Sequence, residues 1–103
     1  MKKKEILKMI SQKYKDDIKK AIKILKKADV KEIYLFGSIA KNEESENSDI
    51  DIAVVGLKPE NYFKVYGKLM MALVHDFDLI KLDDKKSRFA KYIKENEELV
   101  KIA

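Results

Sequence analysis

Hydrophobic residues recur every three or four positions near the start of the chain, from Ile6 to Ala28, and lysines fill most positions between them. This spacing places the apolar side chains on one face of a helix. Two later segments show the same period: residues 59–73, where Pro59 suits the first turn of a helix, and residues 84–96. The pattern therefore predicts three helices.

Three shorter segments are rich in β-branched and aromatic residues, and glycine or polar residues bound them, which is typical of strands. The predicted strands are residues 31–36, 49–55 and 77–82. Residues 37–40 have room for one helical turn only, and the polar, aperiodic residues 41–48 are expected to form a loop. The tail, residues 98–102, is a last strand or a helical extension.

Helices and strands in the order α-β-β-α-β-α, with a possible last strand, predict an α/β (α+β) fold in which helices pack on a small sheet. A length of 103 residues fits one domain. We expect a leading helix over residues 1–28, a core that carries the chemistry over 31–82, and a final helix and tail over 84–103. Neither a signal peptide nor a run of roughly 20 apolar residues is visible, so we expect a soluble cytoplasmic protein with no membrane contact.

The helical spacing also predicts which side chains of the later helices are buried. The expected apolar and core residues are Tyr62, Phe63, Tyr66, Leu69, Met70, Met71, Leu73, Phe89, Ala90 and Ile93. Tyr62, Phe63 and Tyr66 have an alternative role, as a platform for a nucleobase or as a partner surface. Core packing is the interpretation we favour for Phe63.

Charge is unevenly distributed along the chain, which has 23 basic and 18 acidic residues and a formal net charge of +5. The first 31 residues contain twelve lysines and four acidic residues, a net charge of +8, so the remainder carries −3. A lysine-rich helix is typical of a thermophilic surface or of a nucleic-acid contact. Arg88 is the one arginine, and proteins that bind nucleic acids usually favour arginine, so we prefer the first interpretation.

Carboxylates are the plausible metal ligands, because the chain has no cysteine and a single histidine. Asp49 and Asp51 open a predicted strand two residues apart, so their side chains point to the same side. Asp78 lies within another apolar strand, where an unpaired carboxylate is costly. If the two strands are neighbours, the three carboxylates converge and can hold two divalent ions, such as Mg²⁺, for nucleotidyl transfer.

Gly37-Ser38 ends the first predicted strand and supplies a second feature of this site. Glycine allows the backbone to turn tightly and to approach a phosphate closely. If the following residues form one helical turn, its free N–H groups and the Ser38 hydroxyl face an anion. Each feature has a simple structural explanation by itself, such as a strand end or a helix cap, but the ordered set favours a phosphate and metal site.

The arrangement Gly37-Ser38-x10-Asp49-x-Asp51 resembles the signature of the nucleotidyltransferase fold of the DNA polymerase beta superfamily. The short chain is similar to the minimal nucleotidyltransferases that are paired with HEPN-domain proteins. This resemblance implies a mixed sheet and two Mg²⁺ ions on Asp49, Asp51 and Asp78. It also implies that ATP lies against Gly37-Ser38.

Two more residues are candidates for nucleotide binding, Lys41 and Ser48. Many members of the superfamily read Gly-Ser-Arg-x-Arg-Gly at the turn, whereas this chain has Ile39, Lys41 and Asn42 in place of the two arginines and the last glycine. Ile39 cannot contact phosphate, and Lys41 keeps the charge but loses the bidentate geometry of arginine.

Three functions follow as hypotheses. The first is an enzyme that transfers AMP from ATP to a hydroxyl group. The resemblance implies that this hydroxyl belongs to a tyrosine of a HEPN toxin, so that the enzyme acts as an antitoxin. The second is a binding module that neutralises its partner by stoichiometric contact with little or no catalysis, which the missing arginine motivates. The third, less favoured, is a nucleic-acid-binding protein that uses the basic helix. A homodimer and a hetero-oligomer are both compatible with the sequence.

Overall fold

The computed structural model describes residues 12–41 and 48–103. The first residues of the predicted leading helix and most of the predicted 41–48 loop lie outside this range. In chain order the elements are α2 (Gln12–Lys27), β1 (Glu32–Phe36), α3 (Gly37–Ala40), β2 (Ile50–Val55), the 3-10 helix η1 (Pro59–Asn61), α4 (Tyr62–Ala72), β3 (Phe77–Lys81), α5 (Arg88–Asn96) and β4 (Val100–Lys101).

The four strands form one mixed sheet in the order β3-β2-β1-β4. β1 is antiparallel to both β2 and β4, whereas β2 and β3 are parallel. A parallel pair needs a crossover connection, and η1 with α4 provides it. The predicted fold, a small mixed sheet with helices packed on it, is confirmed.

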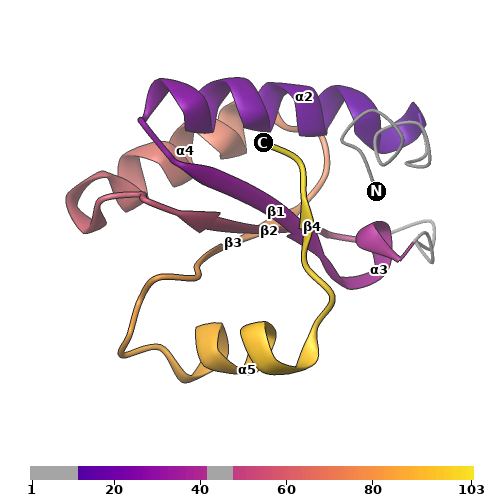
Figure 1. Cartoon of the computed structure of the whole chain (residues 1–103). Helices are drawn as coiled ribbons and strands as arrows, with labels where there is room; N and C mark the ends of the chain where they lie inside the picture. Colours follow the sequence, from indigo (N-terminus) through magenta and orange to yellow (C-terminus); the bar gives the residue numbers. More distant parts are fainter. Residues whose placement is uncertain (1–11, 42–47) are drawn as a thin grey trace.

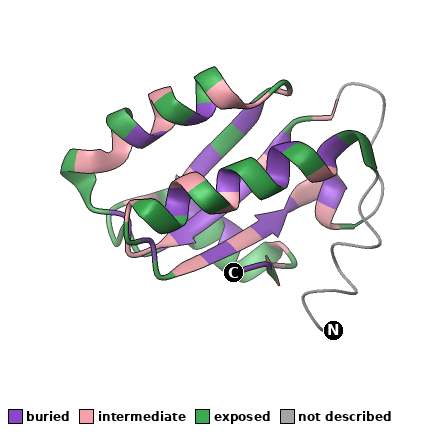
Figure 2. Ribbon diagram, turned by 90° about the horizontal axis from the view of Figure 1, so that it is seen from above, coloured by how far each residue is buried: buried purple, intermediate pink, exposed green. Residues whose placement is uncertain are grey.

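Helices cover both faces of the sheet: α2 and α4 lie on one face and α5 on the other (Figure 1). Viewed from above, α2 and α4 alternate buried and exposed residues along their length, as amphipathic helices do (Figure 2). Side chains alternate between the faces along each strand. Ile33 and Leu35 of β1 therefore belong to the large core under α2 and α4, whereas Tyr34 and Phe36 contact the smaller core under α5.

Four predictions of buried side chains are wrong. Phe63, Met70, Met71 and Phe89 are exposed, with 83%, 63%, 91% and 52% of their surface accessible. The helical period was correct, but α4 packs on the sheet through one face, where Val65 and Leu69 are buried. Nothing among the described residues covers its opposite face. Ala90 and Ile93 are buried in α5, as expected.

The last helix begins at Arg88 and not at residue 84, because Ser87 is its N-cap and the Ser87 hydroxyl accepts a hydrogen bond from the Ala90 N–H at 3.0 Å. The preceding residues form turns instead, with the Ser87 N–H donating to the Asp84 carbonyl. The tail is a strand, limited to Val100–Lys101, and it pairs with β1. No helix within the described part of the chain is both long and apolar enough to cross a membrane.

Candidate active site

Asp51 and Asp78 are brought together by the parallel pairing of β2 and β3, which places the two residues opposite each other. Asp51 is two residues before Ala53, and Asp78 is two residues before Ile80. The side chains of Ala53 and Ile80 contact the core under α5. Because alternate residues of a strand share a face, both carboxylates lie on the α5 face of the sheet. Asp49 is exposed and immediately precedes β2, which begins at Ile50 and not at residue 49.

Asp51 is in a strongly anionic environment. Partial burial raises the pKa of its carboxyl to about 7, helped by the charge of Asp78, a hydrogen bond to Asp78, and the charges of Asp49 and Glu97. Carboxylates that crowd together in this way resist ionisation unless a cation lies between them. A perturbed acid of this kind, next to a second carboxylate, is typical of functional sites.

Gly37 follows β1 directly and lies against Asp51. Its φ of +73° falls in the left-handed region that glycine tolerates best. A Cβ atom at this position would overlap the Oδ2 atom of Asp51. The glycine therefore allows the backbone of the turn to lie beside the carboxylate. Ser38, the next residue, is half-buried in the single turn of α3.

Replacing Gly37 with alanine is expected to destabilise the protein by about 2 kcal/mol or more, because the new methyl group needs a strained φ and displaces Asp51. Urea unfolding at neutral pH measures the change. Gly67 is the matched control, since it lies inside α4 and a Cβ atom added there would have no neighbour within 4 Å. Gly67→Ala should stabilise the protein by roughly 0.5–1 kcal/mol. Equal effects of the two substitutions would contradict the steric argument.

An ion pair between Lys41 and Glu97 connects the end of α3 to the end of α5. Lys41 caps the C-terminus of α3 and Glu97 caps that of α5. The Nζ atom of Lys41 is 3.4 Å from the Oε2 atom of Glu97. Sequence reasoning missed Glu97, because only the packing of α5 on the sheet brings this residue near Asp51. Ser48 is half-buried and precedes Asp49.

The carboxylates of the site meet the needs of Mg²⁺ only in part. No group of three or more His, Cys, Asp or Glu side chains is arranged to hold a metal ion within residues 12–41 and 48–103. The three aspartates therefore do not form a complete cage by themselves. Mg²⁺, however, usually binds through one or two carboxylates together with substrate phosphates and water. The adjacent oxygens of Asp51 and Asp78 fit that type of site.

Comparison with known proteins gives consistent results. A family model described as "Polymerase beta, Nucleotidyltransferase" matches residues 19–102. A protein of Methanocaldococcus jannaschii, "Putative protein adenylyltransferase MJ1379", is 42% identical over 86 residues, which are 80% of this chain and 85% of that protein. A second one from the same organism, MJ0128, is 48% identical over 61 residues, 58% of this chain. That match spans only 61% of MJ0128, less than two thirds of its length.

Solved structures resemble the chain over most of its length. A structure named "Crystal structure of the toxin-antitoxin with AMP-PNP" has a TM-score of 0.61 and 31% identity. The similarity covers 79% of this chain and 69% of that one. A second, of the toxin-antitoxin MntA-HepT, has a TM-score of 0.55 and 30% identity, and covers 81% of this chain and 68% of that one.

Proposed function

Because the chain belongs to the polymerase beta nucleotidyltransferase family, we propose that it transfers AMP from ATP to a hydroxyl group of a partner protein. This membership confirms the resemblance that the Gly37-Ser38 and Asp49-x-Asp51 motifs indicated. The names of the relatives describe protein adenylyltransferases, which supports a protein as the acceptor. The neighbour with AMP-PNP, an ATP analogue, supports ATP as the nucleotide.

The placement of Asp51 beside Asp78, next to the Gly37 turn, is the observation that carries this proposal. In the reaction, the acceptor oxygen bonds to the α-phosphorus of ATP and the bond from that phosphorus to the bridging oxygen breaks, so pyrophosphate leaves. The proton of the acceptor hydroxyl passes to the Asp78 carboxylate. Mg²⁺, when bound, neutralises phosphate charge and polarises the reacting oxygens.

The other candidate residues have roles around this step. Asp49 and Asp51 would hold both metal ions, and Asp78 would help to hold the ion that activates the attacking oxygen. Gly37 and Ser38 would position the β- and γ-phosphates, with Ser48 nearby. Lys41 would contribute positive charge, since an ammonium group has three donors and can serve Glu97 and a phosphate together.

For the acceptor we propose a tyrosine of a HEPN-domain toxin, which the chain would inactivate as its antitoxin in the cytoplasm. The toxin-antitoxin neighbours support this assignment. The test incubates the protein with Mg²⁺, ATP labelled at the α-phosphate, and a HEPN-domain protein from the same organism. Label should appear on a tyrosine of the partner with the wild type and be absent with the double variant Asp49→Asn, Asp51→Asn. Equal labelling by the two proteins, or none by either, would refute the proposed transfer.

A second function, neutralisation by contact alone, is favoured by the absence of a cationic side chain at position 39 of the turn. Ile39 replaces an arginine of the signature, and its side chain is buried in the core with 2% exposure, so no cation is available there. The Lys41 ammonium pairs with Glu97. If the double aspartate variant still protects cells from the toxin, contact is sufficient and catalysis is not required.

A further inference from the structure

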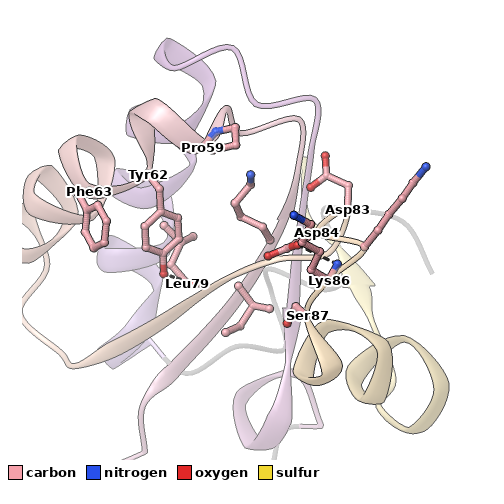
Figure 3. A pocket seen from close by; sticks show the side chains of 11 residues that line it. Pro59, Tyr62, Phe63, Leu79, Asp83, Asp84, Lys86 and Ser87 are labelled. Carbon is pink, nitrogen blue, oxygen red and sulfur yellow. Dashed lines mark hydrogen bonds between the residues drawn. The ribbon is translucent and has the colours of Figure 1, made fainter.

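A cleft of about 580 Å³ lies along the outer edge of β3. Pro59, Tyr62 and Phe63 form one wall, and the segment from Asp83 to Ser87 forms the other (Figure 3). Leu79 lies between the two walls. β3 is at the end of the sheet, so no further strand among the described residues closes this side. The volume lies within the range of pockets that take a small molecule or a few side chains.

We propose that this cleft binds the stretch of the acceptor protein that carries the reacting hydroxyl, an inference that rests on the proposed function. Across the sheet, the order is Gly37 after β1, Asp51 in β2, Asp78 in β3, and then the cleft. An in-line displacement has the leaving and attacking oxygens on opposite sides of phosphorus. With the triphosphate against Gly37, pyrophosphate leaves toward β1, and the hydroxyl arrives from the β3 side.

The cleft is lined by the β3 residues that follow Asp78, the carboxylate proposed to accept the proton. Ile80 lines the cleft and, two residues after Asp78, lies on the same α5 face of the sheet, about 7 Å further along β3. Burial raises the pKa of the Tyr62 hydroxyl, and the charges of Tyr66 and Asp78 raise it further. In this proposal, a segment bound in the cleft extends its hydroxyl along the α5 face of β3 to Asp78.

The wall formed by Pro59, Tyr62 and Phe63 favours an aromatic or aliphatic side chain of a polypeptide, whereas the opposite wall, Asp83 to Ser87, is charged and polar. The Tyr62 hydroxyl donates to the Leu79 carbonyl at 2.6 Å, which occupies that carbonyl at the edge of the sheet. A bound segment therefore inserts a side chain and does not simply extend the sheet at this point. Phe63 is 83% exposed and forms an edge-to-face pair with Tyr62, with ring centroids 5.5 Å apart. Exposed aromatic side chains beside a cleft are typical anchors for a protein ligand.

The test compares Phe63→Glu with Met71→Glu, a matched control on the same helix. Met71 is 91% exposed and does not line the cleft. Transfer is measured against the concentration of the HEPN-domain protein, and nucleotide binding is measured by calorimetry with Mg²⁺ and α,β-methylene ATP. Phe63→Glu should raise KM for the protein acceptor about tenfold or more, with kcat and the Kd of the analogue unchanged. Met71→Glu should stay within about twofold of the wild type.

Three outcomes would overturn the inference. If both variants behave like the wild type while the wild type labels its partner, the cleft does not bind the acceptor, although the proposed function still holds. If Phe63→Glu weakens binding of α,β-methylene ATP, the cleft belongs to the nucleotide. If the wild type binds the analogue but labels no protein, the proposed function fails, and the inference fails with it. Because Phe63 is mostly exposed, its variants should keep the thermal midpoint of the wild type, and Phe63→Ala gives a smaller change in the same direction.

Discussion

Replacing Asp51 with asparagine is expected to lower the rate of nucleotidyl transfer about 10³-fold or more and, in metal-free buffer above neutral pH, to make the protein more stable. The loss of activity follows because the substitution removes a proposed metal ligand at the centre of the site. The gain in stability follows because it removes a carboxylate that is half-buried among Asp78, Asp49 and Glu97. The same substitution is therefore expected to lower the rate of transfer and to raise the free energy of unfolding.

The stability effect should depend on pH in a defined direction. Burial and the neighbouring carboxylates raise the pKa of Asp51 to about 7. An acid with a raised pKa in the folded state favours folding while protonated, and this contribution is lost as the pH rises through that value. Asparagine does not titrate, so Asp51→Asn should match the wild type near pH ~4 and exceed it near pH ~8. With allowance for solvent screening of a half-buried group, the difference is about 1–2 kcal/mol.

Urea unfolding across this pH range measures the difference, and Asp49→Asn is the control. Asp49 is exposed, so its replacement should change stability by less than about 0.5 kcal/mol while still impairing transfer. Mg²⁺ should stabilise the wild type at high pH more than it stabilises Asp51→Asn. A loss of stability in Asp51→Asn near pH ~8 would show that Asp51 is not under electrostatic strain.

Local patterns were sufficient to predict the elements but not their surroundings. The period of 3.6 located α4 and the alternation located β2, because both depend on nearby residues. Whether Phe63 is buried depends on whether another element covers that side of α4, and the sequence of α4 contains no such information. The start of α5 does have a local signal, because Ser87 directly before a helical segment is a typical N-cap.

The candidate site shows the same division between local and tertiary information. Asp49, Asp51 and Asp78 could be selected from the sequence because carboxylates in apolar strands are anomalous. The register that sets Asp51 opposite Asp78 depends on the crossover through α4, and the approach of Glu97 depends on how α5 packs. Neither has a local signal. Asp17 did have one, since it lies beside Ile18 on the apolar side of α2, as anomalous there as Asp78 is in β3.

Replacing Asp17 with asparagine is expected to cost about 2–4 kcal/mol of stability, a drop of roughly 10–20 °C in the thermal midpoint. Asp17 is 2% exposed, and its carboxylate accepts the backbone N–H groups of Val74 and His75 at 3.0 and 2.8 Å. The Nδ1 atom of His75 also lies 2.8 Å from it. The carboxylate thus connects α2 to the segment that leads into β3. Asparagine keeps one acceptor oxygen but turns an NH₂ group toward buried donors.

The pH dependence of this variant should run opposite to that of Asp51→Asn. Burial raises the pKa of Asp17, but the hydrogen bonds from His75 and Val74 outweigh it and hold the pKa below its usual value. An acid with a depressed pKa stabilises the folded state above its unfolded-state pKa, and this contribution is lost as the pH falls through the folded-state value. The difference in the free energy of unfolding between the wild type and Asp17→Asn should therefore be largest at pH ~7 and become smaller below pH ~4.

Asp16→Asn is the matched control, because Asp16 is the adjacent acid on the exposed side of α2 and its loss should change stability by less than about 0.5 kcal/mol. Urea titrations of the wild type and both variants at successively lower pH measure how far each substitution lowers the free energy of unfolding. If Asp17→Asn unfolds at the same urea concentration as Asp16→Asn at pH ~7, the Asp17 carboxylate does not hold the start of β3 to α2. Because β3 carries Asp78, the same variant should also impair transfer below its unfolding temperature, through misplacement of that carboxylate relative to Asp51.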